Sequence, residues 1–213
     1  MRVRNDCKRI AGNGGPPKAA PTYAYKYKTH IRKAPNMENT SSVKVVKTYT
    51  QTMPATRFVG IKYGDGDRVD GMFGEKWHEW LESDRFAAIG NASGGAGDFF
   101  EDSGAPIGLM RYKDGEPFEY WIGMFTPAGT AVPEGFAHLD FAESNIGVCW
   151  LRGPESEIYA RDELVMEAFK ENGIEAKPGA DGAWWFFERY AETRFSVTDA
   201  DGSIILDHCY FLG

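Results

Sequence analysis

The feature of this sequence with the clearest chemical potential is a carboxylate inside an aromatic run. Glu188 lies in Trp184-Trp-Phe-Phe-Glu-Arg-Tyr190. A carboxylate is costly to bury alone, so Glu188 either pairs with Arg189, Arg111 or a backbone donor, or receives a cation or a proton. Ionised, it attracts a cation, to which aromatic faces add about 0.5–2 kcal/mol. With a raised pKa it becomes a general acid, or a base that positions water.

Aromatic residues on the expected strands are the candidate partners of Glu188. Strand alternation places Trp184, Phe186, Glu188 and Tyr190 on one face, and Trp185, Phe187 and Arg189 on the other. The candidate ligand-binding residues beside Glu188 are Trp184, Phe186, Trp150, Tyr112, Tyr120 and Trp121. Phe73, Trp77 and Trp80 have the spacing of a helical core stripe, and Trp80 is kept as a candidate despite that packing role.

The sequence does not contain the residue spacing of a phosphate-binding loop, a nucleophile elbow or a metal site. Gly90–Gly97 is glycine-rich but lacks a Walker lysine and the GxGxxG register, and Ser93 lacks the glycines of a nucleophile elbow. The four histidines are scattered, and the acidic clusters do not match an EF-hand loop. We therefore expect neither a metal nor a cofactor.

The order of predicted elements repeats once along the chain. Strand 57–63, a helix around 73–81 and strands 107–112 and 118–125 are followed by strand 146–151, helix 155–172 and strands 184–190 and 204–211. An additional strand is expected at 43–49. The third element of each half ends in Arg-Tyr, at Arg111-Tyr112 and Arg189-Tyr190. This pattern predicts an α+β fold: a tandem strand-helix-strand-strand repeat that forms a curved antiparallel sheet with two helices on one face.

Composition and charge limit the class of protein. The chain has 213 residues, of which 42% are apolar, enough for one compact domain. Residues 1–40 carry a net charge of +7, which leaves −14 for the remainder. The negative charge of this remainder argues against a nucleic-acid partner and mildly favours cationic ligands. The sequence lacks an apolar run typical of a membrane span or a secretory signal, so a cytoplasmic protein with reduced thiols is expected.

The amino-terminal segment differs from the rest. Residues 1–42 are basic and rich in Gly and Pro, so we expect a disordered arm that is dispensable for folding, followed by one domain over 43–213. Met37 opens a more ordinary start. The first 36 residues are therefore either part of the protein or an upstream extension of the reading frame.

Three segments together resemble GyrI-like effector-binding proteins. They are Trp184–Tyr190 with Arg194-Phe195 and Asp201–Phe211, Gly147-Val-Cys-Trp-Leu-Arg-Gly-Pro-Glu-Ser-Glu-Ile158, and the opening Met53-Pro-Ala-Thr-Arg-Phe-Val-Gly60. The resemblance covers roughly residues 43–213. It implies a pseudo-twofold pair of repeats with a central ligand cleft, and it places the cleft glutamate of the family at Glu188. Some members are sensor domains of multidrug-responsive regulators, and some resemble hydrolases of cyclopropane-containing toxins.

Two functions follow from this resemblance. The first is a standalone protein, a monomer or homodimer, that binds amphipathic, cationic or aromatic small molecules for sensing or sequestration. No helix-turn-helix pattern precedes the domain, which disfavours a transcription factor. The alternative is a hydrolase that opens cyclopropane-containing alkylating compounds, with Glu188 as acid or base and a phenol such as Tyr120 as donor to the developing charge.

Overall fold

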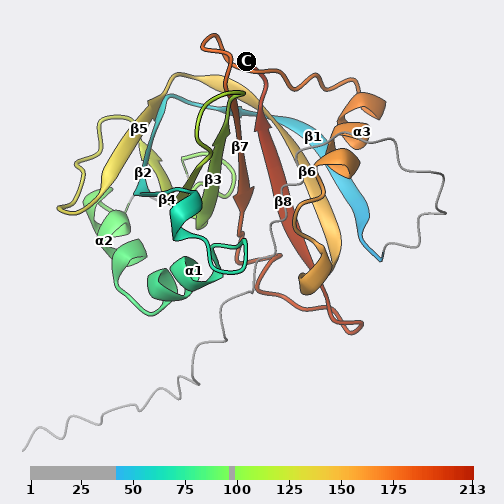
Figure 1. Cartoon of the computed structure of the whole chain (residues 1–213), viewed down its shortest axis with the longest axis horizontal. Helices are drawn as coiled ribbons and strands as arrows, with labels where there is room; N and C mark the ends of the chain where they lie inside the picture. Colours follow the sequence, from blue (N-terminus) through green and yellow to red (C-terminus); the bar gives the residue numbers. More distant parts are fainter. Residues whose placement is uncertain (1–41, 96–98) are drawn as a thin grey trace, which may run out of the picture.

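The computed structural model describes residues 42–95 and 99–213, so the prediction of a disordered arm concerns residues that lie almost wholly outside the described ones. The elements are β1 (Lys44–Met53), β2 (Thr56–Tyr63), α1 (Gly74–Leu81), α2 (Arg85–Ala92), β3 (Ile107–Tyr112), β4 (Glu119–Pro127), β5 (Ala137–Phe141), β6 (Ser144–Pro154), α3 (Asp162–Glu171), β7 (Trp184–Arg189) and β8 (Ser203–Phe211), with 3-10 turns at Asp65–Asp67 and Glu155–Glu157. All the strands join one eight-stranded antiparallel sheet in the order β1-β6-β8-β7-β3-β4-β2-β5 (Figure 1).

The sheet order reveals the predicted duplication. In the first repeat β3, β4 and β2 are neighbours, and in the second β7, β8 and β6 are neighbours in the same relative order. The two repeats meet where β3 pairs with β7 at the centre of the sheet. The strands β1 and β5 extend the two edges, beside β6 and β2. The predicted α+β fold with a tandem strand-helix-strand-strand repeat is therefore confirmed.

Two elements are present that the sequence analysis did not predict. Helix α2 coincides in part with the segment read as a glycine-rich loop, and Ile89 is its one buried residue. Strand β5 is short, and its His138 and Asp140 are exposed while Leu139 and Phe141 are half-buried. Both elements are short, with eight and five residues, so their apolar patterns span too few positions to be recognised in the sequence.

Helix α3 begins later than predicted. The expected start was Glu155, but Glu155–Glu157 form a 3-10 turn and α3 begins at Asp162. Ala160 adopts the left-handed conformation with a φ of 53°, which interrupts a right-handed helix. The helix ends before Gly173, which has a φ of 68°, as expected for a glycine after a helix.

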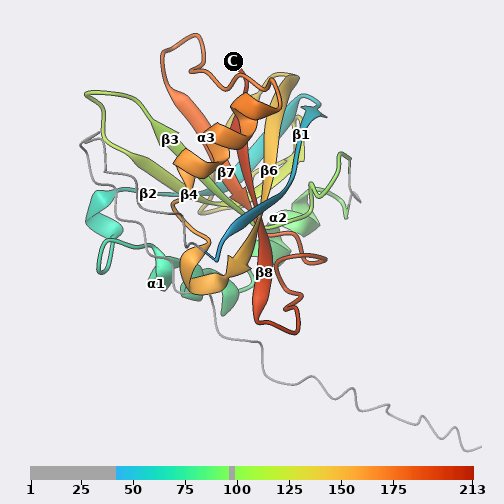
Figure 2. The ribbon, with the colours of Figure 1, turned by 90° about the vertical axis from the view of Figure 1, so that its right-hand side faces the viewer.

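The sheet is curled but not closed. Two-residue connections, Pro54-Ala55 and Ala142-Glu143, join β1 to β2 and β5 to β6, although these strands lie far apart in the sheet order. As a result Phe141 of edge strand β5 stacks on Phe211 of β8, with ring centroids 4.9 Å apart. The sheet therefore has an inner face, inside the curl, and an opposite helix-covered face. Figure 2 shows the strands fanning out, as expected for strong twist.

Each face has its own core. The core of the inner face includes ten buried hydrophobic residues among those described, such as Phe58, Trp121 and Phe187. On the helix-covered face α3 packs on β1 and β6, while α2 packs on β4 (Figure 1). Close approach of α3 requires glycine at position 147, because a Cβ there would lie 2.9 Å from the Phe169 ring. On this face α3 therefore lies over the second repeat, and α1 and α2 lie over the first. The central strands β7 and β3 lie between these two groups.

Candidate functional site

Strand β7 presents Glu188 to the helix-covered face. Phe186 and Tyr190 belong to the core on that face, whereas Phe187 belongs to the core of the inner face. The alternation predicted from the sequence is therefore confirmed for this strand. Because β7 is at the junction of the repeats, Glu188 lies near the centre of the whole sheet.

Glu188 is fully buried and hydrogen-bonded to a phenol. Its side chain has 0% exposure, and the Tyr190 hydroxyl donates to its Oε2 at 2.6 Å. Tyr190 also meets Trp77 of α1 edge to face, with ring centroids 4.6 Å apart. Trp77 in turn donates from its Nε1 to the Tyr120 hydroxyl at 2.8 Å. We call Trp77, Tyr120, Glu188 and Tyr190 the Glu188 cluster.

The absence of a side chain at position 108 makes room for this cluster. Gly108 is the cross-strand partner of Glu188, and a Cβ there would lie 2.7 Å from the Tyr120 hydroxyl and 3.4 Å from Cζ2 of Trp77. Burial and the negative charge of Glu188 raise the pKa of Tyr120 well above its usual range. Tyr120 is therefore a neutral phenol that can donate a hydrogen bond.

A buried histidine lies on the other side of Glu188. His208 of β8 is the cross-strand partner of Glu188, and its Nε2 lies 3.3 Å from the Ile158 carbonyl oxygen. Burial lowers the pKa of His208, while the negative charge of Asp162 acts in the opposite direction. Nearby, Phe186 stacks on Tyr210 at 5.0 Å, and the Tyr210 hydroxyl donates to Asp162 at the start of α3. Side chains with carboxylates, phenols and aromatic rings thus lie close together on the helix-covered face, between α3 and the pair of helices α1 and α2.

The structure separates the remaining predicted residues. Trp80 is fully buried and donates to the Tyr63 hydroxyl at 2.9 Å, so it fills the core as the helical stripe indicated. Trp184 and Tyr112 are cross-strand partners at the far end of the β3–β7 pair, and Tyr112 is 41% exposed. Trp121 and Trp150 belong to the inner face. Of the predicted ligand-binding residues, Tyr120 belongs to the Glu188 cluster, and Phe186 lies two positions before Glu188 on the same face of β7.

The sequence analysis missed Trp77, Gly108 and His208 as neighbours of Glu188. The stripe spacing of Trp77 indicated packing against the sheet, but it did not tell which strand residue the ring meets. Gly108 and His208 are brought to Glu188 by cross-strand register. Register depends on pairing between distant strands, and a single sequence does not specify it.

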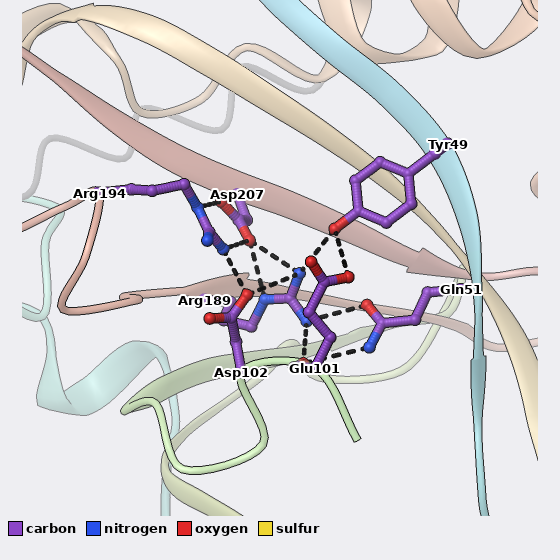
Figure 3. A network of polar contacts seen from close by, with 7 residues as sticks. All are labelled: Tyr49, Gln51, Glu101, Asp102, Arg189, Arg194 and Asp207. Carbon is purple, nitrogen blue, oxygen red and sulfur yellow. Dashed lines mark hydrogen bonds and ion pairs between the residues drawn. The ribbon is translucent and has the colours of Figure 1, made fainter. Parts of the chain in front are cut away.

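The two arginines proposed as partners of Glu188 have other partners. Arg189 points to the inner face, where its guanidinium lies 2.8 Å from the Asp207 carboxylate (Figure 3). Arg111 forms ion pairs with Glu116 at 2.7 Å and Asp181 at 3.4 Å. The salt-bridge interpretation of Glu188 is therefore not supported for either arginine.

The inner face holds an ion-pair network around Arg189 (Figure 3). Asp207, which is fully buried, also binds Arg194 at 2.6 Å, and Arg194 binds Asp102 at 2.6 Å. Arg189 further donates to the Gln51 side chain and to the Glu101 carbonyl, both at 3.0 Å. The network joins β1, β7 and β8 to the segment before β3.

No group of three or more His, Cys, Asp or Glu side chains that could hold a metal occurs within residues 42–95 and 99–213. In the same ranges, no helix is long and apolar enough to cross a membrane.

Comparison with known proteins gives matches among solved structures alone. No family model matches this sequence, and no curated protein matches it. SAV2435, solved in complex with tetraphenylphosphonium, is 16% identical, with a TM-score of 0.53 over 79% of this chain and 94% of that one. This likeness shows a shared fold.

Two further structures match with lower TM-scores. A candidate transcription regulation protein from Staphylococcus aureus MU50 is 16% identical with a TM-score of 0.45, over 78% of this chain and 97% of that one. An integron cassette protein from the mobile metagenome of Vibrio cholerae is 9% identical with a TM-score of 0.44, over 81% of this chain and 100% of that one.

Proposed function

We propose that this chain is a GyrI-like protein that binds an amphipathic, aromatic cation on the helix-covered face, with Glu188 as the polar anchor. The observation that carries the proposal is the buried Glu188 carboxylate, held by the Tyr190 phenol at 2.6 Å where the two repeats meet. SAV2435, which shares the fold, was solved with tetraphenylphosphonium, a cation of this chemical class. That likeness supports the choice of ligand class and leaves the binding residues to be tested.

The chemistry of the Glu188 cluster suits such a ligand. A carboxylate away from water attracts a cation more strongly than an exposed one, because less water screens the charge. Tyr190 donates to the carboxylate, Trp77 meets the Tyr190 ring edge to face, and Phe186 lies two positions before Glu188 on the same face of β7. Rings of this kind add cation–π attraction of about 0.5–2 kcal/mol and bury the apolar part of the ligand. An amphipathic cation satisfies both requirements.

Ligand access requires local rearrangement, because Glu188 has no exposed surface. The cation must displace the side chains that cover the carboxylate. The ligand selects a more open arrangement of those side chains, and its apparent affinity is reduced by the rarity of that arrangement. A ligand that binds only the folded chain stabilises it, so saturation should slow the exchange of amide protons in β3 and β7.

Titration calorimetry with tetraphenylphosphonium tests the proposal. We expect saturable binding by the wild type and a loss of about 1–3 kcal/mol in Glu188→Gln, the scale of a lost contact to a charged group. Glu167→Gln removes the same charge from the exposed surface of α3 and serves as the matched control, with unchanged affinity. No binding by the wild type, or an equal loss in both variants, contradicts the proposal.

Hydrolysis of a strained ring is a second candidate function, favoured by the two phenols beside Glu188. In this reaction the carboxylate takes a proton from water, and the water oxygen bonds to a cyclopropane carbon. The ring bond then breaks, and its electron pair moves to a conjugated carbonyl oxygen that a neutral phenol protonates. The raised pKa of Tyr120 keeps it in the protonated form that this role needs.

Mass spectrometry distinguishes the two candidates. Incubation with a cyclopropane-bearing alkylating compound should give a water adduct with the wild type, and Glu188→Gln should lower the rate by about 10²–10⁴. Background-level product with both proteins leaves binding as the function for that class of compound.

A further inference from the structure

A cavity of about 280 Å³ lies on the inner face of the sheet, separated by the sheet from the Glu188 cluster. Its apolar walls are Leu139 and Phe141 of β5, Trp185 of β7 and Phe211 of β8. Asp140 and Asp181 also border it. The curl of the sheet creates this space, because it brings edge strand β5 opposite β7 and β8.

Three aromatic rings give the cavity a defined shape. Phe141 stacks on Phe211 at 4.9 Å with an interplanar angle of 21°, and it meets Trp185 at 5.5 Å with an angle of 87°. All three side chains remain half-buried, so the rings face both the core and the cavity. Flat walls at right angles suit a flat apolar molecule, which can stack on one wall and meet the other edge to face.

The carboxylates at the border of the cavity already have partners. Both oxygens of Asp140 accept from Arg57, at 2.7 and 2.8 Å. Asp181 accepts from the Ala183 backbone N–H at 3.0 Å and from Arg111 at 3.4 Å. Because these charges are matched, the two carboxylates give little advantage to a cation over a neutral molecule. The chemistry of this cavity therefore differs from that of the buried carboxylate at Glu188.

We propose that this cavity is a second binding site, which takes a neutral, flat aromatic molecule of about two rings. The size follows from the volume, since an apolar cavity of about 150 Å³ holds benzene. This inference rests on the inner face alone and does not depend on the function proposed for Glu188. The two sites lie on opposite faces and select ligands by different chemistry, one by charge and one by shape.

Equilibrium dialysis of 1-naphthol, an uncharged two-ring phenol at pH 7, tests the second site. We expect saturable binding of one molecule per wild-type chain. Trp185→Ala removes one wall and should weaken binding about tenfold, the scale of a lost aromatic contact with its buried area. Leu139→Trp should weaken it as well, by filling the cavity. Val197→Ala, at an exposed position, is the control and should leave binding unchanged.

Thermal unfolding of each variant ensures that only folded protein is compared, and Leu139→Trp, which fills space, keeps the test valid if Trp185→Ala does not fold. Saturating tetraphenylphosphonium should not displace 1-naphthol.

The proposal is overturned if the wild type shows no saturable binding of 1-naphthol, or if neither wall variant changes that binding. Displacement by tetraphenylphosphonium, or a loss in Glu188→Gln alone, would also overturn it and assign the molecule to the Glu188 cluster. A wild-type dimer that Trp185→Ala converts to a monomer would overturn it too, as evidence that a second copy covers the cavity.

Discussion

Adjacent residues of β7 carry buried charges to opposite faces of the same sheet. On the inner face Arg189 and Arg194 surround Asp207, and each guanidinium lies within 2.8 Å of that carboxylate. On the helix-covered face Glu188 accepts a hydrogen bond from the Tyr190 hydroxyl. The opposite charges of Asp207 and the two arginines neutralise each other between strands, whereas the Tyr190 hydroxyl that donates to Glu188 carries no positive charge. We therefore expect the Arg189 network to stabilise the fold, and we propose the Glu188 cluster as the ligand-binding site.

A substitution that breaks the Arg189 network should have the largest effect on the free energy of unfolding. Asp207→Asn removes the charge that Arg189 and Arg194 share, and Arg189 is fully buried. Loss of one partner from a buried pair costs about 3–5 kcal/mol, because the other charge remains buried. Chemical denaturation measures this loss. Asp199→Asn breaks the exposed pair with Arg152 and should leave the denaturation midpoint nearly unchanged. A small effect of Asp207→Asn would remove the structural role of the network.

His208 should make the stability of the fold depend on pH, with an effect smaller than that of Asp207→Asn. Burial lowers the pKa of His208 in the folded state, while an unfolded histidine titrates near about pH 6.5. Below that pH the unfolded chain binds a proton that the folded chain excludes, so stability falls as the pH falls. His208→Gln should flatten the melting temperature between about pH 6.5 and the lowered pKa. His138→Gln, at an exposed position, should not, and an identical profile for both variants would contradict the assignment.

Replacement of Glu188 should have the smallest effect on stability. In Glu188→Gln the amide oxygen can still accept from Tyr190, and the desolvation cost of a buried charge disappears. We expect a change in the free energy of unfolding within about 1 kcal/mol, of either sign, in the same denaturation experiment as Asp207→Asn. A loss as large as that of Asp207→Asn would show that both faces use their carboxylates for stability.

Local patterns predicted most of the fold. The order of predicted elements and the shared Arg-Tyr dipeptide indicated the tandem repeat, and the alternation of β7 indicated the facing of Glu188. Helix α2 and strand β5 were not predicted because their apolar patterns span only eight and five residues. The curl of the sheet could not be predicted, because it follows from two short connections and from pairing of distant strands.

The candidate site was predicted only in part, for a related reason. Glu188 stood out because a carboxylate within aromatic residues is rare. Tyr120 and Phe186 belong to the core of the same helix-covered face, and their roles in ligand binding stay predictions. Trp150 and Trp121 were grouped with them because their strand composition does not tell which face each side chain occupies. They lie on the inner face, where the edge strands come close through the curl. Long-range register decides these facings, so the sequence alone left them open.

The claim that Glu188 anchors a cation is tested most directly by two ions of the same shape and opposite charge. Tetraphenylphosphonium and tetraphenylborate have the same four-ring shape and opposite charges, so their affinities for the wild type isolate the contribution of the buried carboxylate. By titration calorimetry, the wild type should bind the cation at least tenfold more tightly than the anion, and Glu188→Gln should remove most of that difference. Equal affinity of the wild type for the two ions, or an unchanged preference in Glu188→Gln, would contradict the role of Glu188 as the anchor for a cation.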